Sequence, residues 1–199
     1  MLMPFIFDHN LLFIHIPKTG GSSIERKFGL DTFQHNSDIC YSWTEEKVGD
    51  TVFAPQHYTP PMVAERYNNE YNNCKKFTIV RNPYTKIISE YFYRETVYDL
   101  SNLESFIDRI PLEWSDHTIP QKRYFENVDY DYVLRFENLN EEFSKMAKDF
   151  SFSGDLPHHN PSRTGKSSSN YIKDLSKNCI QKINEIYHED FEFLKYNMI

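Results

Sequence analysis

The sequence predicts an α/β fold: a central, mainly parallel sheet with helices on both faces. Short apolar runs alternate with helical patterns along the chain, which is typical of parallel strands joined by helical crossovers. A length of 199 residues suits one domain over 1–199, and such a chain buries about 70% of its unfolded surface. The composition, 39% hydrophobic and 16% aromatic, is that of a globular and not a disordered chain.

Four segments are expected to be strands: 10–16, 51–54, 76–80 and 130–136. The first is an apolar run that ends at Pro17, and its length suits a buried strand. The third is rich in β-branched and apolar residues and stops before an Asn-Pro pair, while 51–54 is the weakest of the set.

Helical patterns follow these strands. A helix is expected to end at Gly29, another to begin at Pro60 with Thr59 as its cap, and an apolar stripe runs from Leu139 to Phe150. Further helices are expected at 84–93, at about 174–188, and as two stretches within 101–127 broken by Pro111 and Pro120.

The net charge is -7, with 22 basic and 29 acidic residues. This balance argues against a nucleic-acid partner, because neutralising a phosphate polymer needs an excess of Lys and Arg. The positive charge is nevertheless concentrated: residues 72–94 hold five basic residues and one acidic residue, a local charge of +4. One small anionic ligand therefore remains compatible with the composition, although a solvated charged face has the same pattern.

Cys40, Cys74 and Cys179 are widely spaced and form no CxxC pair. We expect three reduced, mostly buried thiols, which suits a reducing compartment. The N-terminal segment carries Asp8 and lacks the basic start and small-residue cleavage site of a signal peptide. No apolar run approaches the ~18 residues of a membrane span, so a cytoplasmic protein without such a span is expected.

The segment HIPKTGGSS, residues 15–23, lies between the first strand and the first helix. Adjacent glycines allow backbone N–H groups to turn toward a ligand, and a helix start adds partial positive charge. Lys18 adds a full charge, and Thr19, Ser22 and Ser23 add hydroxyl groups. This combination predicts a phosphate-binding loop, although a tight turn with a capping serine is the simpler alternative.

At this point the sequence resembles the sulfotransferases that use 3′-phosphoadenosine 5′-phosphosulfate (PAPS), especially the Golgi carbohydrate sulfotransferases and their bacterial relatives. HIPKTGGSS is similar to the family's 5′-phosphosulfate loop, and RNPYTKIIS, from Arg81 to Ser89, to its 3′-phosphate signature. Weaker matches follow in the same order at 119–125, 133–139 and 190–196. The resemblance implies a P-loop NTPase-like, three-layer domain.

The resemblance also implies the donor site. PAPS would be the sulfuryl donor and adenosine 3′,5′-bisphosphate the product, with no metal required. Arg163 and Lys166 lie in an irregular stretch, 151–170, which is expected to close over the cofactor or, equally, to be a mobile solvated loop. The residues expected to bind the donor are Lys18, Thr19, Gly20, Gly21, Ser22, Ser23, Arg81, Ser89, Arg163 and Lys166.

Family members transfer the sulfuryl group by in-line displacement, which depends on positioning and charge stabilisation. Lys18 is expected to stabilise the leaving phosphate, and His57, after the second strand, to act as the general base. His15 fits a structural role better. The remaining candidates are His117, His158 and His159 as acceptor-binding residues and Glu65 and Glu137 as alternative carboxylates, Glu137 fitting a structural role better.

The acceptor is expected to be a hydroxyl on a carbohydrate or glycolipid, by analogy with this branch of the family. Aromatic stretches at 91–98 and 124–132 suit stacking on sugar rings, and suit core packing equally well. Two other functions stay open. A nucleotide-dependent kinase or NTPase is disfavoured because no GK[ST] follows the glycines. A non-catalytic domain that binds 3′,5′-phosphoadenosine is disfavoured by the histidine expected beside the loop.

Overall fold

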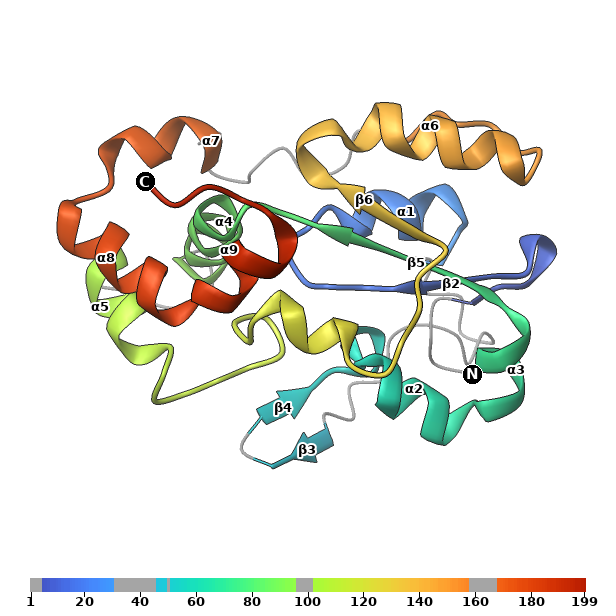
Figure 1. Cartoon of the computed structure of the whole chain (residues 1–199), viewed down its shortest axis with the longest axis horizontal. Helices are drawn as coiled ribbons and strands as arrows, with labels where there is room; N and C mark the ends of the chain where they lie inside the picture. The colour runs from blue at the N-terminus through green and yellow to red at the C-terminus, as the bar shows by residue number, and fades with distance from the viewer. Residues whose placement is uncertain (1–4, 31–45, 50, 96–101, 158–167) are drawn as a thin grey trace.

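The structure is a computed structural model that describes residues 5–30, 46–49, 51–95, 102–157 and 168–199. A four-stranded sheet lies at its centre, with the strand order β1-β2-β5-β6 (Figure 1). The strands are β1 (Phe5–Ile6), β2 (Leu11–Ile14), β5 (Lys75–Val80) and β6 (Tyr132–Arg135). β2, β5 and β6 are parallel, and β1 adds an antiparallel edge. The mainly parallel sheet is therefore confirmed.

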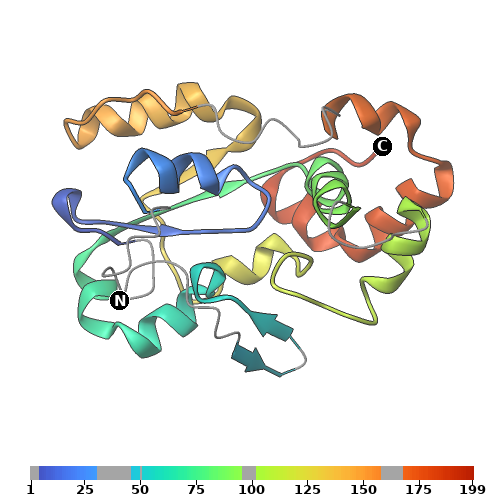
Figure 2. The same cartoon turned by 180° about the vertical axis from the view of Figure 1, so that it is seen from behind.

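The two faces of β2 pack against different layers, because alternate side chains of a strand point to opposite sides. Leu11 and Phe13 join the cluster that contains Ile24 of α1 (Gly21–Lys27) and Phe143 of α6 (Leu139–Asp149). Leu12 and Ile14 join the cluster formed with α2 (Pro60–Arg66) and α3 (Asn68–Asn73). Figures 1 and 2 show these helix pairs on opposite faces of the sheet.

The expected strand at 51–54 exists, but its place in the central sheet was wrong. β4 (Thr51–Phe53) forms a separate antiparallel hairpin with β3 (Glu46–Val48), and an isolated bridge pairs its Val52 with Ser115. The reason is its burial: within β4 only Phe53 is buried, whereas a central parallel strand buries both faces.

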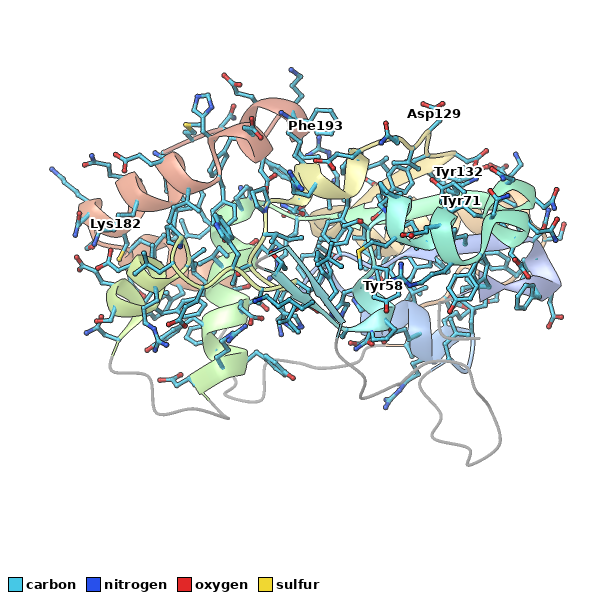
Figure 3. The ribbon with its side chains drawn as sticks, turned by 90° about the horizontal axis from the view of Figure 1, so that it is seen from below. Tyr58, Tyr71, Asp129, Tyr132, Lys182 and Phe193 are labelled. Carbon is cyan, nitrogen blue, oxygen red and sulfur yellow. The ribbon has the colours of Figure 1, made fainter. Side chains whose placement is uncertain are left out.

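A second group of helices packs beyond the carboxyl end of the sheet. It comprises α4 (Pro83–Glu95), α5 (Leu103–Arg109), α7 (Ser168–Tyr171), α8 (Lys177–Ile186) and α9 (His188–Leu194). α4, α5, α8 and α9 share one apolar cluster, which contains Ile87, Ile107 and Ile183. In Figure 3, Lys182 of α8 marks this end, and Tyr71, Asp129 and Tyr132 mark the opposite end.

Several expected helices differ in detail. The helix expected at about 174–188 corresponds to α8, and a further helix, α9, follows it after Tyr187. Of the two stretches expected within 101–127, the second is a short 3-10 turn, η3 (Gln121–Phe125). Thr59 occupies the cap position of α2, yet its side chain makes no capping hydrogen bond.

Cys74 and Cys179 are buried free thiols, as expected, and Cys40 lies outside the described residues. None of the helices within the described ranges combines the length and apolar character needed to cross a membrane.

Candidate functional site

The segment between β2 and α1 turns sharply at the carboxyl edge of the sheet. Gly20, the N-cap of α1, has a φ of 97°, and Lys18 has a φ of 67°. A left-handed conformation is costly for residues with a Cβ, so Gly20 suits this turn. A Cβ atom on Gly20 would also lie 3.0 Å from Cδ2 of Phe136. The glycine therefore allows the loop to pass close to the start of the β6–α6 connection.

The second glycine of the loop is needed for a different reason. A Cβ atom on Gly21 would lie only 2.1 Å from Nε2 of His15, which occupies the space beside the loop. His15 is buried, and its Nδ1 shares a 2.8 Å hydrogen bond with Oε1 of Glu25 on α1. The ring thus holds strand, loop and helix together, which is consistent with the structural role expected for His15.

The predicted hydroxyl groups of the loop are not equivalent. Thr19 is fully buried and donates its hydroxyl to the carbonyl of Ile16 at 2.7 Å, so this proton is used within the loop. Ser22 and Ser23 lie in the first turn of α1 and are half-buried. They are the better placed of the predicted hydroxyl donors.

Arg81 follows β5 and joins this strand to the loop. Its Nη1 donates to the carbonyl oxygen of Lys18 at 2.7 Å, and its Nε donates to Oγ1 of Thr85 at 3.0 Å. A further hydrogen bond reaches Ser168, at the start of α7. Burial lowers the pKa of Arg81 to about 10, so the guanidinium remains charged at neutral pH. The structure therefore brings the two sequence signatures together at one edge of the sheet.

The other residues predicted to bind PAPS are less well supported by the structure. Ser89 lies on α4, two turns beyond Arg81, and is half-buried. Arg163 and Lys166 lie outside the described residues, as do His158 and His159.

His57 lies in a 3-10 turn, η2 (Pro55–His57), which follows β4. It reaches the site from this turn, outside the central sheet, and not from a strand of that sheet. Its Nδ1 shares a 2.7 Å hydrogen bond with Oδ2 of Asp116, which also accepts a bond from the backbone N–H of Ala54 at 3.1 Å. Among the described residues, the His57 ring hydrogen-bonds through Nδ1 alone, so Nε2 is left for a reacting proton.

Burial sets the protonation of this pair. It lowers the pKa of His57 to about 4, against the opposing effect of the hydrogen bond to Asp116. Burial raises the pKa of Asp116, but the hydrogen bond and charge of His57 outweigh it and bring the value to about 2. At neutral pH the pair is therefore a neutral imidazole oriented by an ionised carboxylate, as a general base requires.

His57 is the middle member of a row of three imidazole rings. The ring centres of His15 and His117 each lie 4.9 Å from that of His57, at interplanar angles of 82° and 75°. His117 has a carboxylate partner of its own, because its Nδ1 shares a 2.8 Å hydrogen bond with Oε2 of Glu90. Glu90 is completely buried and also accepts a 2.6 Å bond from Nε of Arg94.

The segment 115–118 supplies both Asp116 and His117, and it is tied to several elements. Lys86 of α4 donates to the carbonyl oxygen of His117 at 2.7 Å, and Tyr187 donates to that of Thr118 at 2.6 Å. Arg94 donates to Oγ of Ser115 at 3.0 Å. We expected only an acceptor-binding role for His117 and missed Asp116 and Glu90; the similarity to the family at 119–125 was the nearest sequence signal.

Lys18 extends from the loop toward this histidine row. Its Nζ lies 4.1 Å from the centre of the Tyr93 ring, which in turn stacks on His117 at 5.7 Å. The charge of Lys18 is also among the causes that lower the pKa of Glu90. Lys18 and His57, the two residues expected to carry out the reaction, therefore both lie beside the group formed by Tyr93 and the histidine row. We call this group the centre of the site.

One group of possible metal ligands occurs among the described residues. His57, Asp116 and His117 offer ligand atoms within 4.8 Å of one another. Two of these side chains are already joined by the 2.7 Å hydrogen bond, and the third is bonded to Glu90. We interpret the group as an acid–base cluster.

The alternative carboxylates lie elsewhere. Glu137 accepts from the backbone N–H of Asn82 and from the hydroxyl of Tyr196, both at 2.8 Å, which fits a structural role. The side chain of Glu65 is 80% exposed.

No curated protein and no solved structure matches the chain. The sulfotransferase family, in contrast, matches residues 5–197, which include the loop, Arg81 and the histidine row. The chain belongs to the sulfotransferase family.

Proposed function

We propose that the protein transfers the sulfuryl group of PAPS to an acceptor hydroxyl. Family membership supports sulfate transfer in general, and members of the family generally use this donor. The observation that carries the catalytic part is the buried His57–Asp116 pair, which shares one centre with Lys18 of the loop.

The two sequence signatures correspond to the two charged groups of PAPS, the 5′-phosphosulfate and the 3′-phosphate. The loop 18–23 turns at the carboxyl edge of the parallel strands, the edge at which open α/β sheets bind ligands. We assign the 5′-phosphosulfate to Lys18, the loop N–H groups, Ser22 and Ser23, and the 3′-phosphate to Arg81 and Ser89. In a P-loop-type fold, the loop between a strand and a helix likewise binds phosphate through its backbone N–H groups. Contacts from Arg163 and Lys166 remain predictions of the resemblance.

The reaction is an in-line displacement at sulfur. The acceptor oxygen forms a bond to sulfur while the bond from sulfur to the phosphate oxygen breaks, and the electron pair of that bond stays on the phosphate. Lys18 stabilises the charge that develops on this oxygen. Nε2 of His57 takes the hydroxyl proton, and Asp116 stabilises the imidazolium that forms. The products are adenosine 3′,5′-bisphosphate and a sulfate ester, and no step needs a metal.

A carbohydrate or glycolipid acceptor is proposed by analogy with the carbohydrate branch. Three of the aromatic side chains considered for sugar stacking, Tyr91, Phe92 and Tyr124, are buried. Tyr93 differs, because it is 44% exposed and borders the histidine row. Of the aromatic residues in these two stretches that the structure describes, it is the most exposed, and we assign it the contact with a sugar ring.

The alternatives fit the site less well. A kinase would need the GK[ST] lysine after the glycines, but Lys18 precedes them. A non-catalytic binding domain leaves unexplained why a histidine is oriented by a buried carboxylate beside the loop.

The proposal is tested by incubating the protein with radiolabelled PAPS and a panel of glycans and glycolipids. Label should move to at least one hydroxyl acceptor without added metal. Transfer of phosphate from ATP to the same panel, with none from PAPS, would contradict the proposal.

A further inference from the structure

Besides the structural His15–Glu25 pair, the histidine row contains two histidine–carboxylate pairs, and their side chains differ in exposure. The His57 side chain is 8% exposed and that of its partner Asp116 is 11% exposed. The His117 side chain is 20% exposed, although its partner Glu90 is fully buried. His117 is therefore the ring that a bound substrate reaches more readily. The proposed function uses only the His57–Asp116 pair.

The position of His117 is fixed more firmly than an acceptor-binding loop residue requires. Its backbone N–H donates to Oδ1 of its neighbour Asp116 at 2.9 Å, and its carbonyl oxygen accepts from Lys86 at 2.7 Å. Its ring is held by Glu90 at Nδ1. Glu90 is paired with Arg94 as well as with His117, so its buried charge is compensated while it holds the ring. Such support is expected around a group that contacts substrate.

The neighbours of His117 place it toward Lys18, in the loop that is proposed to bind PAPS. Tyr93 stacks on its ring, and Nζ of Lys18 lies over Tyr93. Burial raises the pKa of Glu90, but the charge and hydrogen bond of His117 outweigh it and bring the value to about 2, so this carboxylate stays ionised. The other charged groups around the ring are Asp116 on the negative side and Lys18, Lys86 and Arg94 on the positive side.

We propose that His117, held by Glu90, binds the sulfuryl group of the donor and aligns it between the leaving phosphate and the acceptor oxygen. The inference rests on the proposed function. A histidine ring that carries a proton on each nitrogen donates through both, so Nδ1 donates to Glu90 while Nε2 donates to a sulfuryl oxygen. His117 breaks no bond and exchanges no proton with the acceptor, because His57 takes the acceptor proton.

The test compares the affinity for PAPS, without acceptor, with that for adenosine 3′,5′-bisphosphate, which lacks the sulfuryl group. His117→Ala should weaken PAPS binding about tenfold or more, the size of a lost charge-assisted hydrogen bond, and leave the bisphosphate within about twofold. Glu90→Gln should weaken PAPS binding to a smaller extent. His117→Asn keeps a donor and should fall between the wild type and His117→Ala.

Two further variants sharpen the comparison. His57→Ala should lower the rate of transfer while leaving both affinities within a few-fold, because His57 is proposed to act on the acceptor. His188→Ala, at an exposed histidine of α9 that pairs with Glu192, serves as the matched control and should change neither affinity. Circular dichroism checks that each variant is folded.

Equal loss of affinity for both ligands in His117→Ala and His117→Asn would assign the residue a structural role and overturn the inference. Unchanged affinity for PAPS would overturn it as well. A wild-type protein that binds neither ligand is a different result, because it would contradict the proposed function itself.

Discussion

The loop at 15–23 and the segment at 115–118 both border the site, but they are built differently. The loop forms its shape from its own sequence: the turn needs Gly20, and Gly21 makes room for His15 six residues earlier. The segment 115–118 acquires its role through distant partners, since Asp116 meets His57 across 59 positions and His117 meets Glu90 across 27. The shape of the loop is thus encoded locally, whereas the histidine–carboxylate pairs depend on the tertiary fold.

This difference predicts that the two functions can be separated by mutation. Changes at His57 should affect transfer and spare adenosine 3′,5′-bisphosphate, and changes at the strand end or loop should affect binding of this nucleotide or the fold. The expected effects below run from the largest to the smallest.

His57→Ala should lower kcat about 10³-fold, the usual contribution of a positioned general base. Affinity for adenosine 3′,5′-bisphosphate, measured by calorimetry, should stay within a few-fold, because the proposed role of His57 involves the acceptor and not the nucleotide. Full activity in this variant would move the base to another residue.

Arg81→Ala should weaken adenosine 3′,5′-bisphosphate about 30-fold, as expected for a lost charge-assisted hydrogen bond. The 5′-monophosphate should be affected much less, since it lacks the 3′-phosphate. Arg81 also holds the carbonyl of Lys18, so a small loss for both ligands is expected. Equal losses for the two nucleotides would refute the assignment of the 3′-phosphate to Arg81.

Gly21→Ala should destabilise the protein by about 1–3 kcal/mol, because the added methyl group overlaps the His15 ring. Thermal unfolding measures the effect, and Ser22→Ala at the next position provides the control. The double variant with His15→Ala should be more stable than the sum of the two single effects predicts, since the overlap is gone. Strict additivity would show that the two residues do not compete for this space.

Acid should destabilise the histidine row progressively. The pKa of His57 is lowered from 6.5 to about 4, so the unfolded chain binds more protons in this window and the stability from this group is lost as the pH falls through it. The pKa values of Asp116 and Glu90 are lowered to about 2 from 3.8 and 4.5, and their contribution is lost at still lower pH. Urea unfolding of the wild type and of His57→Ala from pH 6.5 to 4 measures the first effect, which should be smaller in the variant. Identical pH dependence in the two proteins would contradict the burial of a neutral His57.

Much of the fold was predictable, because apolar periodicity reflects burial directly. β2, β5, β6 and α6 lie where the pattern places them. β4 was assigned to the wrong sheet, since three residues of weak alternation do not indicate a pairing partner.

The candidate site was also predictable only in part. The loop, Arg81 and His57 carry recognisable patterns or family signatures, whereas Asp116 and Glu90 resemble any other carboxylate in the sequence. Glu90 lies on the helix that carries the 3′-phosphate signature, one residue after Ser89, and the packing of α4 against the segment 115–118 brings it to His117. Side chains that act through tertiary pairs have no local spacing to detect.

The central claim is that the loop and Arg81 bind a nucleotide with phosphates at both the 3′ and 5′ positions, beside a centre that transfers sulfate. Calorimetric titration of the wild-type protein with adenosine 3′,5′-bisphosphate, and separately with ATP and magnesium, tests it most directly. We predict saturable binding of the bisphosphate and much weaker binding of ATP. A preference for ATP would contradict the sulfotransferase assignment of this site.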